Sequence, residues 1–332
     1  MDSKRTWQEA IAQYQKPDNL RSIWQLINTL VPYAALWVFM AFSLKISYWL
    51  TLVGVILAGG LLVRIFIIFH DCGHGSFFKS AKANAFWGFI TGILIFTPYS
   101  YWWHKHAQHH ASSGDLDRRG IGDVWTMTVK EYLAASRWLR IKYRLARNPL
   151  VLFVIAPPFL FLVLHRIPHK ISGPRAERSV HLTNLAVLGM VAVLVAILGV
   201  KNYLLIQLPI VWIAASAGVW LFYVQHQFEG VYWERHENWD YLTEAIQGSS
   251  FYKLPKILQW FTGNIGFHHV HHLSPKIPNY FLERCHREVT LFCDIKPITL
   301  LASFKSLVFR LWDEKGKRLV GFGDLKRIKA TA

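Results

Sequence analysis

Histidines gather in three short clusters of this 332-residue chain, and crowded imidazoles are its clearest sign of chemistry. Imidazole titrates near neutrality and is the commonest side-chain metal ligand, so clustering it for packing alone is unusual. The clusters are HDCGH at 70–74, HAQHH at 106–110 and HHVHH at 268–272, and one further histidine lies in VQHQFEG. The candidate ligands are therefore His70, His74, His106, His109, His110, His226, His268, His271 and His272.

The spacing within each cluster is helical. Members lie four residues apart, or at i, i+3 and i+4, and these offsets share one face of an α-helix, so each cluster is expected to aim its imidazoles at one point. Nine imidazoles exceed the four ligands of a structural zinc site and predict two metal ions that keep coordination positions open. Beside apolar helices the pattern suggests redox chemistry on a lipid, which favours iron because zinc has no redox states.

Other polar residues near the clusters are candidates for supporting roles. Asp71 could orient a ligand imidazole, whereas Asp115 could do the same or cap a helix. Asn264 could hydrogen-bond near the metals or only shape a turn with its neighbouring glycines. His104 and His269 fall off the shared faces and are expected to support ligands rather than bind metal. The remaining histidines are expected at the membrane interface or in solvent: His165, His169, His181, His236 and His286.

Long apolar runs must position these clusters. Four runs, at about 30–44, 49–69, 182–200 and 203–224, approach the roughly 20 apolar residues that a membrane span needs. With 53% hydrophobic residues, the chain is predicted to be an all-α integral membrane protein. Its four transmembrane helices would form two hairpins, joined by re-entrant or interfacial helices and by a cytosolic helical cap that holds the metal site.

Two shorter apolar stretches are expected not to cross the membrane. The stretch 85–96 is too short to span, and 150–164 carries Pro157 and Pro158 at its centre. If neither crosses, all three clusters and His226 lie on one face of the membrane. The basic loop after 164 then stays on the cytosolic side, in agreement with the positive-inside rule.

The chain divides into a polar amphipathic start at 1–29, a membrane domain at 30–290 and a basic C-terminal tail at 291–332. The first thirty residues contain no cleavable apolar core, so no secretory signal is expected. The three cysteines form no CxxC pair, which fits a reducing cytosol. The net charge of +17 lies mainly outside the spans. It predicts contact with anionic headgroups, or a dock for an acidic soluble protein, rather than nucleic-acid binding.

With these motifs in order, the chain resembles the membrane fatty acid desaturases. That family carries three histidine boxes, which here read HDCGH, HAQHH and HHVHH. The three-residue gap in the first box and the continuation HHLSPKIPNY at 271–280 are similar to the acyl-lipid branch. SGDLDRRGIGDVWT at 113–126 and FTGNIG at 261–266 are similar to a bacterial subgroup of it.

The resemblance implies a non-haem di-iron centre that uses molecular oxygen and two electrons to place a cis double bond in an acyl chain. It assigns the eight box histidines as ligands, and His226 less firmly. It also implies a location in a bacterial cytoplasmic membrane with the boxes facing the cytosol. No cytochrome b5 domain or GxGxxG fingerprint is present, so the electrons are expected from a separate carrier: a ferredoxin, or alternatively a cytochrome b5-type protein or a flavodoxin.

Two alternatives stay open at this stage. A hydroxylase or ketolase of alkanes, sterols or carotenoids would use a similar set of histidines. A membrane metal carrier is the non-enzymatic alternative, but carriers place their ligands inside the spans near the midplane. The four predicted spans contain no internal histidine or carboxylate. The position of the double bond, the headgroup of the lipid and the oligomeric state cannot be deduced from the sequence.

Overall fold

A computed structural model describes residues 7–120, 122–168 and 173–330 of the chain. Four of its helices are long and apolar enough to cross a membrane: α2 (Asn19–Ser43), α3 (Tyr48–Gly73), α9 (Gly173–Leu198) and α10 (Val200–His226). They match the four predicted runs to within two residues at the C-terminal ends of the first and third runs, and the strands in the described chain are at most three residues long. The prediction of an all-α membrane architecture is therefore confirmed.

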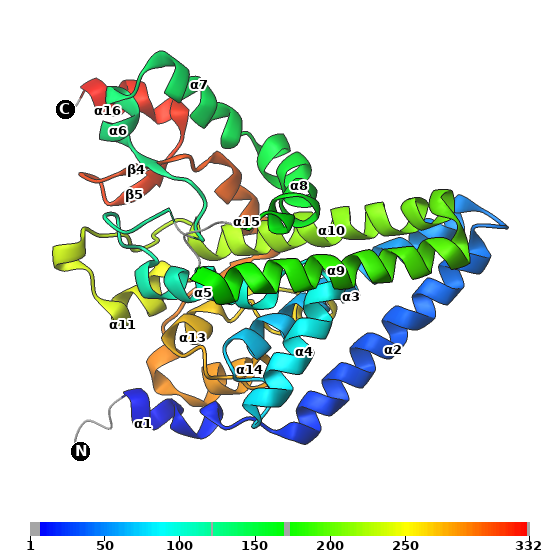
Figure 1. Ribbon diagram of the computed structural model, residues 1–332. Coiled ribbons are helices and arrows are strands. Elements are labelled where there is room, and N and C mark those ends of the chain that lie inside the picture. Colours follow the sequence, from blue (N-terminus) through cyan, green and yellow to red (C-terminus); the bar gives the residue numbers. More distant parts are fainter. Residues whose placement is uncertain (1–6, 121, 169–172, 331–332) are drawn as a thin grey trace.

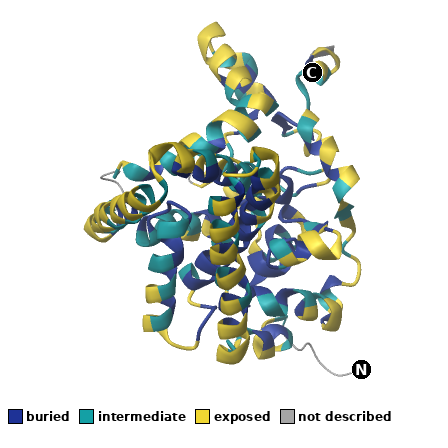
Figure 2. Cartoon of the chain, turned by 90° about the vertical axis from the view of Figure 1, so that its right-hand side faces the viewer, coloured by how far each residue is buried: buried dark blue, intermediate teal, exposed yellow. Residues whose placement is uncertain are grey.

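The four long helices form two hairpins that turn at the same end of the molecule (Figure 1). Helix α3 lies between α2 and α10 and is the most buried of the four. Ile65 and Phe69 of α3 and Ile206 and Ile210 of α10 are fully or almost fully excluded from solvent in the shared core. Helix α9 instead exposes apolar side chains such as Leu185 and Ile197, which suits contact with lipid (Figure 2).

Two shorter elements occupy the stretches that were expected not to cross. Helix α4 (Ala81–Leu94) has 14 residues, or about 21 Å at 1.5 Å per residue, which is less than the roughly 30 Å of a hydrocarbon core. Residues 151–162 form a π-helical turn (Val151–Ile155) and α8 (Ala156–Leu162). This segment meets α7 (Arg137–Ala146) at a bend of 55°, and the bent pair would be a fifth span if it crossed.

A cap of short elements covers the end of the molecule opposite the hairpin turns (Figure 1). Its main helix is α5 (Tyr99–Ser112), which follows α4. The smaller helices are α1 (Trp7–Ile11), α6 (Val129–Ala134), α11 (Tyr241–Thr243), α12 (Lys256–Phe261), α13 (His268–Leu273), α14 (Asn279–Glu288), α15 (Leu300–Ser303) and α16 (Leu325–Ala330). The strands are β1 (Met127–Thr128), β2 (Phe251–Lys253), β3 (Pro297–Thr299), β4 (Leu311–Asp313) and β5 (Arg318–Val320).

The C-terminal segment 291–332, which sequence reasoning expected as a basic tail, contributes ordered structure to this cap. Strand β3 pairs in parallel with β2, and β4 pairs in parallel with β1 and antiparallel with β5. Leu311 and Trp312 of β4 are fully buried. Apolar residues of this segment therefore help to close the cap, whereas basic residues such as Lys305 and Lys317 are exposed and Arg310 is buried.

Candidate metal centre

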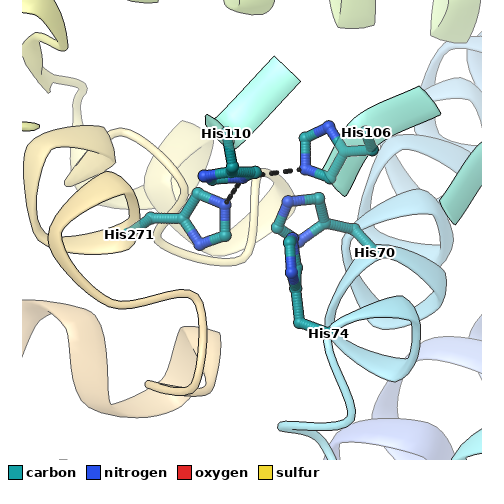
Figure 3. Close-up of side chains that lie close together, drawn as sticks. All are labelled: His70, His74, His106, His110 and His271. Carbon is teal, nitrogen blue, oxygen red and sulfur yellow. Dashed lines mark hydrogen bonds between the residues drawn. The ribbon is translucent and has the colours of Figure 1, made fainter. Parts of the chain in front are cut away.

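The first group of candidate ligands contains five histidines from three helices. His70 and His74 come from the end of α3, His106 and His110 from α5, and His271 from α13 (Figure 3). Their candidate ligand atoms all lie within 4.8 Å of one another. The Nε2 atom of His110 is 3.1 Å from Nε2 of His106 and 2.9 Å from Nε2 of His271. We call these residues the five-histidine group.

The second group contains His109 of α5, His226 at the end of α10, and His268 and His272 of α13. Their candidate ligand atoms also lie within 4.8 Å of one another. Nε2 of His226 is 3.2 Å from Nε2 of His109 and 3.0 Å from Nε2 of His268. We call this the four-histidine group. The ring centroids of His110 and His272 are 4.4 Å apart, so the two groups are adjacent.

The structure thus brings together all nine predicted candidates, but it corrects the expectation that each cluster aims at one point. The pairs spaced i, i+4 stay together: His70 with His74, His106 with His110, and His268 with His272. The third member of a cluster, His109 or His271, faces the other group. At about 100° per residue, i+4 lies roughly 40° from i on a helix whereas i+3 lies roughly 60° to the other side. One helical turn therefore supplies both groups.

Local packing fixes the first two clusters. His70 lies in the last turn of α3 and His74 caps that helix. The Tyr99 hydroxyl donates to the carbonyl oxygen of Cys72 at 2.6 Å, which ties the start of α5 to the end of α3. The Trp102 ring then stacks on the His106 ring at 4.3 Å between centroids. The first two clusters are therefore held by neighbouring regular helices.

The third cluster depends on irregular backbone. Gly263 and Asn264 have φ of 51° and 59°, the left-handed region that glycine and asparagine tolerate best. The Tyr252 amide of β2 donates to the Gly266 carbonyl at 2.7 Å, and a Cβ on Gly266 would lie 2.3 Å from the Tyr252 carbonyl oxygen. Only glycine fits this close approach, which places α13 against β2.

Five of the candidate ligands are held in the neutral form that binds metals. Burial, with added repulsion between neighbouring imidazoles, holds the pKa of His106, His110, His268, His271 and His272 well below the usual range. Several buried imidazole nitrogens have no hydrogen-bond partner among the described residues, including Nε2 of His74 and of His272. An unpaired buried polar atom is costly, and a bound cation would remove that cost.

The nitrogen spacing also fits metal ions. Metal–imidazole bonds of about 2.0–2.1 Å place neighbouring ligand nitrogens about 3 Å apart. The Nε2–Nε2 distances of 2.9–3.2 Å within the two groups match that value. The residues present therefore fit two adjacent metal ions with imidazole ligands.

Asp71, predicted to orient a ligand, lies where that role requires it. One of its carboxylate oxygens is 3.0 Å from Nδ1 of His70. The other accepts from the backbone amide of Asn279 at 2.6 Å and from its side-chain amide at 2.8 Å. A carboxylate that accepts from Nδ1–H leaves Nε2 free to bind a metal.

Two further carboxylates contact candidate ligands and were not predicted. An Asp123 oxygen is 2.6 Å from Nδ1 of His109, and a Glu244 oxygen is 3.4 Å from Nδ1 of His272. Burial raises the pKa of Glu244 to about 8. Asp123 and Glu244 lie 14 and 28 residues from the histidines that they contact. Separations this long form no local motif that identifies either residue in the sequence. The acidic residues next to the box in the resembling stretch 113–126 were the only available signal for Asp123.

Asp115 and Asn264 support the surroundings rather than the imidazoles of the two groups. Asp115 contacts Nδ1 of His236 at 2.7 Å. Asn264 donates to the Asn279 carbonyl at 3.2 Å and accepts from Gln259 at 3.0 Å. Asn264 thus shapes the turn before α13 and reaches Asp71 only through Asn279.

The remaining histidines lie outside both groups. His104 contacts Gln108, and Nε2 of His269 is 3.0 Å from Nδ1 of His286. His181 and His236 are exposed as expected. The expectation of an interfacial or solvated His165 is wrong, because this side chain is buried against Thr97 and Phe161. His169 lies outside the described residues.

A cavity of about 430 Å³ reaches the four-histidine group. Its lining includes His226 itself, Phe222 and Asp123, which contact members of that group, and also Trp125 and Leu139. The Phe222 ring lies 5.1 Å from the His109 ring and 5.0 Å from the His226 ring. A ligand in this cavity would therefore lie beside one group and not the other.

Comparison with known proteins gives a consistent result. The model of the fatty acid desaturase family matches residues 46–300, a range that includes all nine candidate histidines. A fatty acid desaturase of Bacillus subtilis is 50% identical over 321 residues, which cover 97% of this chain and 91% of that protein. An sn-1 acyl-lipid omega-3 desaturase (ferredoxin) of Synechocystis is 26% identical over 243 residues, or 69% of this chain and 64% of that protein.

Proposed function

This chain belongs to the fatty acid desaturase family, and we propose that it places a cis double bond in the acyl chain of a membrane lipid, using two iron ions held by its nine clustered histidines. As a family member it is an integral membrane oxidoreductase that acts on paired donors with O2. The observation that carries the metal assignment is the pair of adjacent, buried histidine groups at one end of the spanning helices.

Iron, when bound, would supply the activation of O2 and the removal of two hydrogens from neighbouring methylene groups. The protein's part is to prepare the ligands. Asp71 and Asp123 each face an Nδ1 atom, which fixes the proton there and turns Nε2 of the same ring towards the centre. Glu244 lies 3.4 Å from Nδ1 of His272. Burial of the four-histidine group excludes bulk water, which prevents side reactions at the metals.

The electron donor is proposed to be a separate ferredoxin. The related Synechocystis protein carries ferredoxin in its name, and the net charge of +17 favours an acidic partner. We place the cap on the cytosolic side of a bacterial inner membrane, because an opposite orientation would export its many lysines and arginines. Failure of reduced ferredoxin to support turnover, with activity from a cytochrome b5-type donor, would contradict the donor assignment.

The test is the fatty acid profile, by gas chromatography with mass spectrometry, of a host that lacks desaturases and expresses this chain with a ferredoxin system. New unsaturated chains are expected with the wild type and not with His271→Ala at matched expression. Metal analysis of the purified protein should find two irons per chain. A well-expressed wild type with two irons and only hydroxylated products would contradict the desaturase assignment.

A further inference from the structure

Apolar side chains line part of the cavity beside the four-histidine group. His226 of the four-histidine group and Phe222, which contacts it, line the cavity together with Trp125, Met127 and Leu139. Its volume of about 430 Å³ lies within the roughly 300–1,000 Å³ of small-molecule sites. Its shape and chemistry therefore suit a hydrocarbon segment held next to the metal ligands.

Arg119 is the only lysine or arginine among the residues that line this cavity. Its Nη2 atom donates to Oε1 of Glu131. Its Nη1 atom is buried and has no hydrogen-bond partner among the described residues. A guanidinium presents a fork of donors that matches two oxygens of a phosphate or carboxylic ester. Arg119 therefore has a donor that no described residue uses.

The acidic residues of the lining are already engaged elsewhere. Asp115 contacts His236 at 2.7 Å and Asp123 contacts His109 at 2.6 Å. Glu131 accepts from the Thr128 amide at 2.8 Å in a capping box, in addition to its contact with Arg119. None of these carboxylates faces Nη1 of Arg119 within hydrogen-bond distance. The guanidinium thus keeps a hydrogen-bond donor without a partner among the described residues, and this donor suits the polar end of a ligand.

Leu139 connects this cavity to a helix that is suited to a membrane surface. It belongs to α7, on which Trp138, Ile141 and Leu145 are exposed apolar side chains. Arg137 and Lys142 of the same helix are also exposed. Exposed tryptophan and aliphatic side chains combined with basic residues are typical of helices that lie in the headgroup region.

The position of α7 agrees with this role. In Figure 1 α7 lies at the top of the molecule, between α6 and α8. After a bend of 55° the chain continues into Val151–Arg166, where Leu150, Ile155 and Phe159 expose apolar side chains. The outer wall of the cavity is therefore continuous with a surface that fits the bilayer.

We propose that this cavity receives the acyl chain of an intact membrane lipid from beneath α7, and that Arg119 binds an ester or phosphate oxygen at the head end of that lipid. This inference rests on the proposed function and identifies the substrate-binding residues of the same site. An anchored head end fixes how far along the chain the four-histidine group acts. Arg119 is thereby a determinant of the double-bond position.

The experiment compares Arg119→Gln, Arg119→Lys and wild type in the desaturase-free host, with double-bond positions read by mass spectrometry after derivatisation. Wild type is expected to give one dominant position. Arg119→Gln should lower the unsaturated yield about tenfold and spread the product over at least two positions, with two irons retained. Arg119→Lys keeps the charge and should restore part of the yield.

Arg118→Gln is the matched control, because Arg118 is the exposed neighbour and does not line the cavity. It should keep the wild-type product pattern. Leu139→Trp provides a second probe that leaves Arg119 intact: a larger ring in the wall should lower the yield or shift the double bond with irons retained. This probe decides the matter if Arg119→Gln does not fold.

The outcomes are distinguishable. If wild type desaturates and neither Arg119→Gln nor Leu139→Trp changes yield by more than twofold or alters the bond position, the cavity is not the substrate site and this inference fails alone. If Arg118→Gln matches Arg119→Gln, the effect is one of general surface charge and the anchor is refuted. If wild type with two irons gives no unsaturated product, both proposals fail.

Discussion

The two histidine groups share the short helices α5 and α13, but they differ in the long helix that completes each group and in exposure to solvent. The five-histidine group has two pairs spaced i, i+4 and one further ligand, and two of its members, His74 and His106, are partly exposed. The four-histidine group has one such pair, and its members are all buried. The cavity that we assign to substrate touches the second group through His226. The group with fewer ligands is therefore the one that faces the cavity.

The difference follows from which helix serves which group. Helices α5 and α13 contribute to both groups, whereas α3 contributes only to the five-histidine group and α10 only to the four-histidine group. Helices α3 and α10 pack against each other along their length. Variants at the ends of these two helices can therefore perturb one group at a time.

The largest effect is expected from His226→Ala. This change leaves three imidazoles in the four-histidine group. The protein should therefore lose about one of its two irons, and the yield of unsaturated product should fall more than about 100-fold. His74→Ala leaves four imidazoles in the other group and should keep more of its iron, although its product should still fall at least tenfold. Losing a metal ligand should cost at least as much as the roughly 10–100-fold losses known for changes to outer-sphere residues at metal sites.

Metal analysis of the purified variants, beside lipid profiling at matched expression, tests this difference. Equal iron loss in His226→Ala and His74→Ala would show that ligand number does not distinguish the groups. Retention of both irons in His226→Ala would remove His226 from the ligand set.

A smaller effect is expected from the supporting carboxylates. Asp71 is buried and accepts from both amides of Asn279 as well as facing His70. Asp71→Asn should lower iron affinity about 10–100-fold and the free energy of unfolding by about 1–3 kcal/mol, because a buried donor is left without an acceptor. The Asp123 side chain is 20% exposed, so water can replace part of its hydrogen bond to His109. The loss of iron affinity in Asp123→Asn should therefore lie near the lower end of that range, at about tenfold.

Competition with a chelator measures the iron affinities, and thermal unfolding of the iron-free variants measures the stability difference. A larger loss for Asp123→Asn than for Asp71→Asn would reverse the expected order. It would indicate that the four-histidine group depends more on its carboxylate than on its burial.

Much of this architecture could be predicted because it depends on local patterns. Apolar length identified the four spans, and helical spacing identified the box histidines. The premise that all the clusters lie on one membrane face, combined with the parity of crossings, predicted that the stretches 85–96 and 150–164 do not cross. His226 has no partner at helical spacing and was included because it lies just past the last predicted span. These inferences need only residue type and distance along the chain.

The division into two groups required three-dimensional information. Spacing shows that His106, His109 and His110 share a helix face, but not that two neighbouring centres divide that face between them. Glu244 and Asp123 reach the site through loops whose paths are set by tertiary packing. The ordered C-terminal segment was missed for the same reason, since β3 and β4 are three residues long and pair with strands far away in sequence.

The smallest effect is expected from His269→Gln. This variant tests whether α13 carries a histidine that is not a metal ligand beside its candidate ligands. His269 lies between ligands of both groups in sequence, yet its ring faces His286, Phe251 and Phe292. Glutamine can keep one hydrogen bond there, so the variant should retain two irons and more than about a third of its product. Its free energy of unfolding should fall by about 0.5–1.5 kcal/mol.

The matched comparison is His268→Gln, one residue earlier, which removes a ligand of the four-histidine group and should lose iron and product. The two neighbours then differ only in the direction of their side chains. Iron loss in His269→Gln as large as in His268→Gln would mean that the pair of His269 with His286 holds α13 in place for both groups. The asymmetry between the groups would then matter less than the shared helix that supplies them.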